Sequence, residues 1–70
     1  MTAVLANATV DILVPTTPQK FGQFVVDVWG QPPYDYTKSY VIQARDNTAA
    51  AQQGIQKFVE EAEALGPKRN

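Results

Sequence analysis

Hydrophobic and polar residues alternate along three stretches of the chain, and apolar residues recur at helical spacing along a fourth. In residues 4–14 the even positions are all apolar, whereas the odd positions include Asn7, Thr9 and Asp11. Alternation with a period of two is typical of a β-strand with one buried face. We therefore expect a strand here whose even-numbered side chains face the core.

Two further stretches, residues 21–29 and 37–45, show the same alternation and are expected to be strands as well. Loops separate the three strands, because residues 15–20 and residues 30–36 each contain two prolines, which cannot donate to the ladder of a central strand. The even-numbered side chains of these two strands are expected to face the core: Phe24, Val26, Val28, Tyr40, Ile42 and Ala44.

Residues 47–65 are expected to form the one helix of the chain. The side chains at 46–48 can all accept a hydrogen bond from the free amides of a first turn. Gly66 and Pro67 follow the helix and end it. Glycine readily adopts the left-handed backbone conformation, and proline has no backbone N–H to continue the helical hydrogen bonds. The apolar residues have the spacing of one buried stripe. They are Ala51, Ile55, Phe58, Val59, Ala62 and Leu65.

Gly54 lies inside this expected helix, where glycine costs about 1 kcal/mol relative to alanine. Together with Ala50 and Ala51 it gives the helix a surface of small residues. Two interpretations stay open. The surface lets the backbone of a partner approach closely, or the helix packs tightly on its own sheet beneath a large residue such as Phe24 or Tyr40.

These elements predict a small α+β domain in the order β-β-β-α, a three-stranded antiparallel sheet with one C-terminal helix packed on its even-numbered face. We expect residues 1–70 to form a single domain, with residues 67–70 as a frayed tail. A domain of this size buries only about 60% of the surface that its unfolded chain exposes. Because the chain has no cysteine for a disulfide, stabilisation by oligomerisation or by a larger partner is favoured.

Charge and hydropathy disfavour several classes of partner. A net charge of −1 and a pI near 5.0 give no field that would attract nucleic acid or anionic lipid. The apolar N-terminal run is interrupted by Asn7 and Asp11, is too short to span a bilayer, and has no preceding basic residue of a signal peptide. We therefore expect a cytoplasmic protein that contacts no membrane, and the charge disfavours nucleic acid as a partner.

The residue inventory argues against catalysis. The chain has neither histidine nor cysteine, so the commonest general base and the commonest strong nucleophile are absent. Asp11 and Asp27 could face each other on neighbouring strands. Without a cleft that raises the pKa of one of them, such carboxylates are usually solvated charges and not a catalytic pair. We expect no enzymatic activity, no cofactor and no metal site.

The odd-numbered face of the predicted sheet carries apolar side chains that a single helix cannot cover. They are Leu13, Val25, Trp29 and Val41. A plausible register gathers them into one patch with Tyr34 at its rim, and exposed apolar patches mark contact surfaces. These five residues are our candidate partner-binding site, either for self-association or for a larger protein. The open alternative is that they are isolated strand-forming residues diluted by polar neighbours such as Gln23 and Asp27.

Two other features offer routes to binding. The edge strands carry unpaired backbone groups that can pair with another chain. The loop around Pro32 and Pro33 concentrates Trp29, Tyr34 and Tyr36, whose rings either anchor a small ligand or single-stranded nucleic acid, or close the end of a thin core.

The pattern of residues 21–65 consists of two strands with aromatic residues, a short polar turn and an alanine-rich helix containing Phe58 and Val59. In this pattern the chain resembles small phage-encoded accessory proteins, some of which are compact α+β domains that bind and inhibit a large host enzyme such as RNA polymerase. The resemblance implies a non-enzymatic protein that acts by binding another protein in the cytoplasm of a host cell. It carries no specific motif, so it assigns no functional residue.

Overall fold

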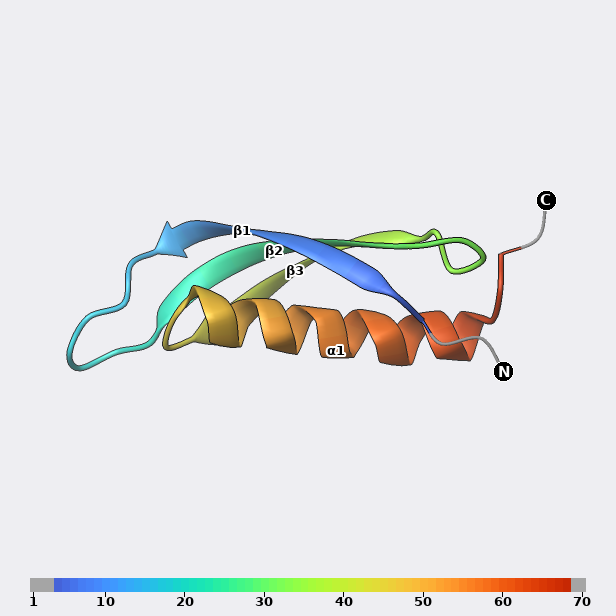
Figure 1. Ribbon diagram of the computed structural model, residues 1–70. Helices are drawn as coiled ribbons and strands as arrows, with labels where there is room; N and C mark the ends of the chain where they lie inside the picture. The colour runs from blue at the N-terminus through green and yellow to red at the C-terminus, as the bar shows by residue number, and fades with distance from the viewer. Residues whose placement is uncertain (1–3, 69–70) are drawn as a thin grey trace.

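A computed structural model describes residues 4–68 of the chain (Figure 1). It contains strand β1 at Ala6–Val14, strand β2 at Gly22–Gly30, strand β3 at Thr37–Ala44 and helix α1 at Asn47–Leu65. All four predicted elements are therefore confirmed. The bounds of the helix agree with the prediction, and those of the strands differ by one or two residues.

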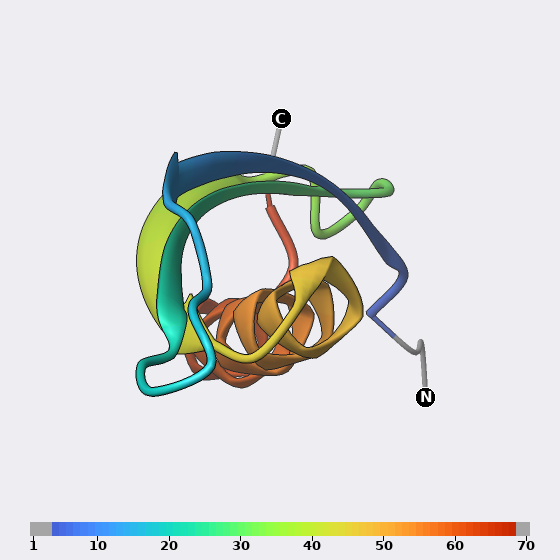
Figure 2. The ribbon, with the colours of Figure 1, turned by 90° about the vertical axis from the view of Figure 1, so that its left-hand side faces the viewer.

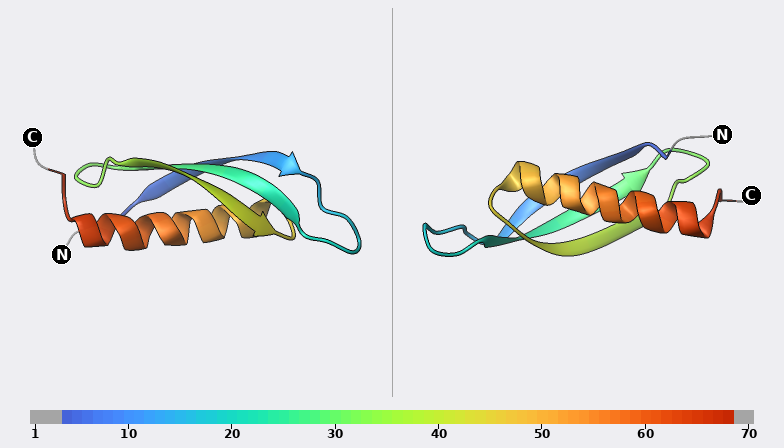
Figure 3. Two further views of the ribbon diagram at one scale, coloured as in Figure 1. Left: turned by 180° about the vertical axis from the view of Figure 1, so that it is seen from behind. Right: turned by 90° about the horizontal axis from the view of Figure 1, so that it is seen from below.

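The three strands form one antiparallel sheet in the order β1-β2-β3, and α1 packs along one of its faces. The predicted α+β fold is therefore confirmed. The sheet twists and curves over the helix (Figure 2), so it has an inner face toward α1 and an outer face away from it. Within residues 4–68 no element covers the outer face (Figure 3).

The core lies between the inner face and α1. From the sheet, Phe24, Val26, Val28, Ile42 and Ala44 are all 3% exposed or less, and they are joined by three equally buried residues of the helix. The partners across the strands are Val26 and Tyr40, and Phe24 and Ile42, so the even positions of β2 and β3 share one face as predicted. Burial of these side chains, at about 25 cal/mol per Å² of apolar area, is the main stabilising term of the domain.

Helix α1 approaches the sheet through its small residues. Its buried positions are Ala50, Gly54, Phe58 and Ala62. A Cβ atom built on Gly54 would lie only 2.6 Å from Cγ1 of Val26. Gly54 therefore serves close packing on the protein's own sheet, above Val26 rather than above Phe24 or Tyr40.

The predicted helical stripe is wrong in part. Ala51 and Ile55 are only half-buried, and Leu65 is exposed. The stripe is rotated because Ala50 and Gly54 let the helix axis come closest to the sheet along their line, and the larger Ile55 is displaced to the side of the contact.

Both ends of α1 are capped as the sequence predicts. The Asp46 carboxylate accepts a hydrogen bond of 2.8 Å from the backbone N–H of Ala49, which satisfies one of the free amides of the first turn. At the other end Gly66 has a φ of 81°, and its N–H donates to the carbonyl of Ala62 at 2.9 Å. Glycine suits this position because a positive φ carries no steric cost without a Cβ atom.

A β-bulge interrupts strand β1 near its end. Ile12 lies opposite Phe24, but Val14 lies opposite Gln23, which leaves Leu13 as an extra residue without a partner. The bulge shifts the alternation by one residue, so Val14 joins the outer face instead of the core. The prediction that Ile12 and Val14 are buried is wrong, since they are 59% and 45% exposed. The bulge accounts for Val14, whereas Ile12 lies before it, at the end of an edge strand.

The chain is held against the loop between β2 and β3 after α1 has ended. Tyr36 Oη donates to the carbonyl of Gly66 at 2.6 Å, and the backbone N–H of Lys68 donates to the carbonyl of Pro33 at 2.6 Å. The Lys68 ammonium lies 5.6 Å from the centre of the Tyr36 ring. The sequence predicts a frayed tail over 67–70, whereas Lys68 is hydrogen-bonded; residues 69–70 lie outside the described residues.

Candidate protein-binding surface

The outer face is built from the odd-numbered residues of the three strands, and the register arranges them in rows across the sheet. Three rows each take one residue from β1, β2 and β3 in turn. They are Asn7–Trp29–Thr37, Thr9–Asp27–Ser39 and Asp11–Val25–Val41. Beyond the bulge a fourth row follows, Val14–Gln23–Gln43.

Val25 and Val41 lie directly opposite each other in this arrangement. Val41 is on an edge strand and is 64% exposed, whereas Val25 is half-buried on the central strand between Val41 and Asp11. Cβ atoms of opposite residues in an antiparallel pair are about 5 Å apart. The structure therefore brings these two candidate residues into one apolar surface.

Trp29 is separated from this pair. The row between them carries Thr9, Asp27 and Ser39, and Ser39 Oγ donates to a carboxylate oxygen of Asp27 at 2.5 Å. Because this row is polar and charged, Trp29 is separated from the apolar pair and is a single exposed ring at the other end of the face. The prediction of a single patch is therefore wrong. For Asp27 the alternative holds, since this polar residue separates Trp29 from the Val25–Val41 pair.

Leu13 is 55% exposed at the bulge, and two further apolar residues that the sequence pattern did not indicate line this end of the outer face. Val14 occupies the outer face beside Gln23, and Phe21, immediately before β2, is 51% exposed. One signal was available: Ile12, Leu13 and Val14 are three consecutive apolar residues, so strict alternation has already ended there.

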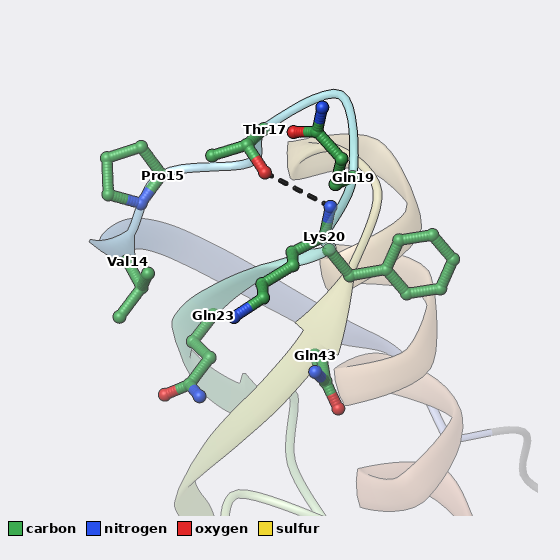
Figure 4. Close-up of a pocket in the computed structure, with 8 residues that line it drawn as sticks. Val14, Pro15, Thr17, Gln19, Lys20, Gln23 and Gln43 are labelled. Carbon is green, nitrogen blue, oxygen red and sulfur yellow. Dashed lines mark hydrogen bonds between the residues drawn. The ribbon is translucent and has the colours of Figure 1, made fainter.

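An open depression with a volume of about 760 Å³ lies on the outer face at the end of the sheet where residues 15–21 join β1 to β2, which we call the hairpin end (Figure 4). Gln23 and Gln43 lie opposite each other across β2 and β3 and line it, with Val14 and Phe21 as its large apolar side chains. Its other lining residues are Pro15, Thr17, Gln19 and Lys20. The depression therefore combines apolar walls with amide groups that can both donate and accept hydrogen bonds.

Hydrogen bonds within the loop give this depression a defined shape. Thr16 Oγ1 donates to the carbonyl of Arg45 at 3.1 Å and accepts from the N–H of Gly22 at 3.1 Å, which ties the loop to the ends of two strands. The N–H of Lys20 donates to Thr17 Oγ1 at 3.1 Å. The Arg45 guanidinium lies 5.5 Å from the centre of the Phe21 ring, within range of a cation–π interaction.

The aromatic rings near the second loop do not form one surface. Tyr34 and Tyr36 are half-buried and pack against the core cluster on the inner side, where Tyr36 bonds to the end of α1. Trp29 lies on the outer face. The prediction that Tyr34 lies at the rim of the outer-face surface is therefore wrong, because the loop folds back and packs this side chain against the core cluster.

Two pairs of ionisable side chains are neighbours in the structure, Asp11 with Asp27 and Tyr40 with Glu61. Asp11 lies opposite Val25 and Asp27 lies opposite Thr9, so the two carboxylates are diagonal neighbours and the expected direct pairing is wrong. Tyr40 Oη donates to a carboxylate oxygen of Glu61; partial burial, this hydrogen bond and the charge of Glu61 all raise the pKa of Tyr40. Within residues 4–68 no three potential ligands gather where they could hold a metal ion.

Comparison with known proteins gives no match to a family model, a curated protein or a solved structure. A search of residues 4–68 for a helix both long and apolar enough to cross a membrane also finds none.

Proposed function

We propose that this protein is non-enzymatic and works by binding another protein through its outer face at the hairpin end. The observation that supports the proposal most is that the sheet is covered on only one of its two faces. Helix α1 covers the inner face, while large apolar side chains on the other side stay in water. The proposed binding residues, which we call the outer-face patch, are Val14, Phe21, Gln23, Val25, Val41 and Gln43.

The composition of the outer-face patch suits a protein partner. Its apolar members offer area whose removal from water is favourable by about 25 cal/mol per Å². Gln23 and Gln43 add uncharged donors and acceptors that can satisfy the backbone of a bound segment. Leu13 is exposed next to this surface at the bulge, whereas Trp29 lies beyond the polar row and is proposed only as a peripheral contact.

Two roles fit such a surface. The protein either docks on a larger protein as a small regulator, or it joins a larger assembly as a structural component. We favour the regulator, because the patch is confined to one end of one face and the pattern resembles small phage accessory proteins that bind host enzymes. The same resemblance leads us to propose the cytoplasm of a host cell as its location.

The proposal is tested by affinity capture with matched charge variants. Val41→Lys places an ammonium within the outer-face patch, and Gln56→Lys adds the same charge at an exposed position of α1. We expect the wild type and Gln56→Lys to capture the same proteins from cytoplasmic extract in similar amounts. Val41→Lys is expected to capture at least tenfold less of these proteins. Mass spectrometry of the bound fraction measures the ratio.

Circular dichroism of both variants serves as the control, and native spectra are expected because both positions are exposed. Equal capture by the two variants, or capture of nothing by the wild type, would contradict binding through this surface.

A further inference from the structure

Every second residue of strand β1 has its backbone N–H and C=O groups directed away from β2, toward the edge of the sheet. The N–H of Gln31 donates to the carbonyl of Leu5 at 2.8 Å, which identifies these two residues as a hydrogen-bonded pair. Hydrogen-bonded pairs alternate along an antiparallel ladder, so the odd residues of β1 bond to β2. The N–H and C=O groups of the even residues therefore point to the free edge. These residues are Ala6, Ala8, Val10 and Ile12.

The two outer strands lie at opposite margins of the sheet (Figure 3), and β1 is the one suited to accept another strand. β3 carries Lys38, and its Tyr40 donates a hydrogen bond to Glu61 of α1, with Lys57 beside that bond. Charged groups of this kind block edge-to-edge pairing. β1 contains no lysine, arginine or proline over nine residues, and its one charge, Asp11, lies on the outer face.

We infer that β1 pairs antiparallel with β1 of a second copy of this chain, about a two-fold axis at Thr9. In this register Ala6 lies opposite Ile12 of the second copy, and Ala8 lies opposite Val10. Each such pair exchanges two backbone hydrogen bonds, so the symmetric interface forms roughly eight. The two three-stranded sheets join into one, and both helices lie on the same side of it.

The side chains favour this register over the one that is centred on Asp11. With the axis at Thr9, Asn7 lies opposite Asp11 of the second copy, and its amide can donate to that carboxylate. An axis at Asp11 would instead place two carboxylates opposite each other, which is destabilising. The chosen register also uses residues 6–12 and stops before the bulge, where regular pairing ends.

This inference is independent of the proposed function. It uses the edge of β1, whereas the proposed binding surface uses side chains of the outer face, mainly from β2 and β3. One surface stays free when the other is occupied, so a dimer joined at β1 would present two copies of the outer-face patch.

Charge variants of Asn7 test the register itself. Asn7 is exposed and faces Trp29 within the monomer, so either charge is tolerated there. Across the interface, Asn7→Lys meets Asp11 of the second copy with opposite charge, and Asn7→Asp meets it with like charge. We expect the dimer dissociation constant, measured by sedimentation equilibrium at low salt, to fall about threefold to tenfold with Asn7→Lys and to rise about as much with Asn7→Asp.

Ala8→Pro tests the use of the edge. It removes an N–H that points away from β2, and edge strands tolerate proline at such positions. We expect dimerisation to weaken at least tenfold while circular dichroism shows a folded monomer. A wild type that stays monomeric up to millimolar concentration would overturn the inference, and so would equal dissociation constants for the two Asn7 variants. The Asn7 pair decides the matter if Ala8→Pro does not fold, and Val41→Lys is expected to leave the dimer unchanged.

Discussion

At the scale of single residues, the contact between Gly54 and Val26 decides how close the helix can come to the sheet. Any Cβ at position 54 would lie 2.6 Å from Cγ1 of Val26, a methyl group held on a fully buried side chain of the central strand. Overpacking of a core typically costs about 1–3 kcal/mol, while alanine improves helix propensity by about 1 kcal/mol. Because Val26 has no space to retreat, the steric cost is expected to be the larger.

We therefore predict that Gly54→Ala lowers the free energy of unfolding by about 1–2 kcal/mol in urea denaturation. Gln53→Ala, one residue away on the exposed face, is the matched control and should leave stability unchanged or slightly raised. The double variant with Val26→Ala should lose less than the sum of the two single variants, since the smaller side chain removes the clash. A stabilised Gly54→Ala protein would show that the helix can shift outward freely.

At the scale of elements, α1 and β3 are joined at the surface by the hydrogen bond from Tyr40 to Glu61. Burial, this bond and the charge of Glu61 raise the pKa of Tyr40 above its ordinary value of about 10. The tyrosine is thus stabilised in its protonated form in the folded state. Its contribution to stability is complete below about pH 10 and is lost as the pH rises toward the folded pKa.

We predict that Tyr40→Phe costs about 0.5–1.5 kcal/mol of unfolding free energy at pH 7, the usual value of one hydrogen bond. The difference between wild type and variant should shrink as the pH is raised from 10 to 11, as measured by urea denaturation at each pH. Titration of lysines and of the other tyrosines affects both proteins equally and cancels in the difference. A difference that is constant over this range would contradict the assigned pKa shift.

The bulge in β1 is the other feature that belongs to this scale. It turns Val14 from the inner to the outer face, and thereby places an apolar side chain beside the Gln23 and Gln43 amides. Without the extra residue at Leu13, the depression at the hairpin end would lose one of its two large apolar side chains. The proposed binding surface therefore depends on this irregularity of the strand.

At the scale of the whole molecule, one central strand is flanked by two edges of different character in a body that measures 46 × 18 × 14 Å. β2 has backbone partners on both sides, and its inner side chains are the most buried of the sheet. Local opening is easiest where few buried contacts must break. The central strand is therefore expected to open last and the edges first.

We predict a corresponding pattern of amide hydrogen exchange. In dilute protein the amides of Ala8 and Val10 should exchange quickly, whereas those of Thr9 and Asp11 exchange slowly because they bond to β2. At concentrations that favour the dimer, Ala8 and Val10 should become protected, and the edge amide of Val41 in β3 should stay fast. Protection of Val41 together with fast exchange at Ala8 would indicate pairing through β3 instead.

The sequence by itself determined the elements and most of the core. Period-two alternation identified the inner faces of β2 and β3, because a side chain points to the opposite face at each step of a strand. Asp46 and Gly66 fixed the ends of α1, because their capping chemistry is local. The absence of histidine and cysteine and the apolar odd face led to protein binding as the proposed function.

Only the tertiary structure decided how the strands line up. The outer-face residues were correctly assigned in β2 and β3, but the register placed the Asp27 row between Trp29 and the Val25–Val41 pair. Three other features likewise depend on contacts between residues far apart in the chain. They are the bulge in β1, the close packing of Gly54 on Val26 and the packing of Tyr34 against the core. Local patterns fix which face a side chain takes, whereas neighbours across strands are set by the packing of the whole domain.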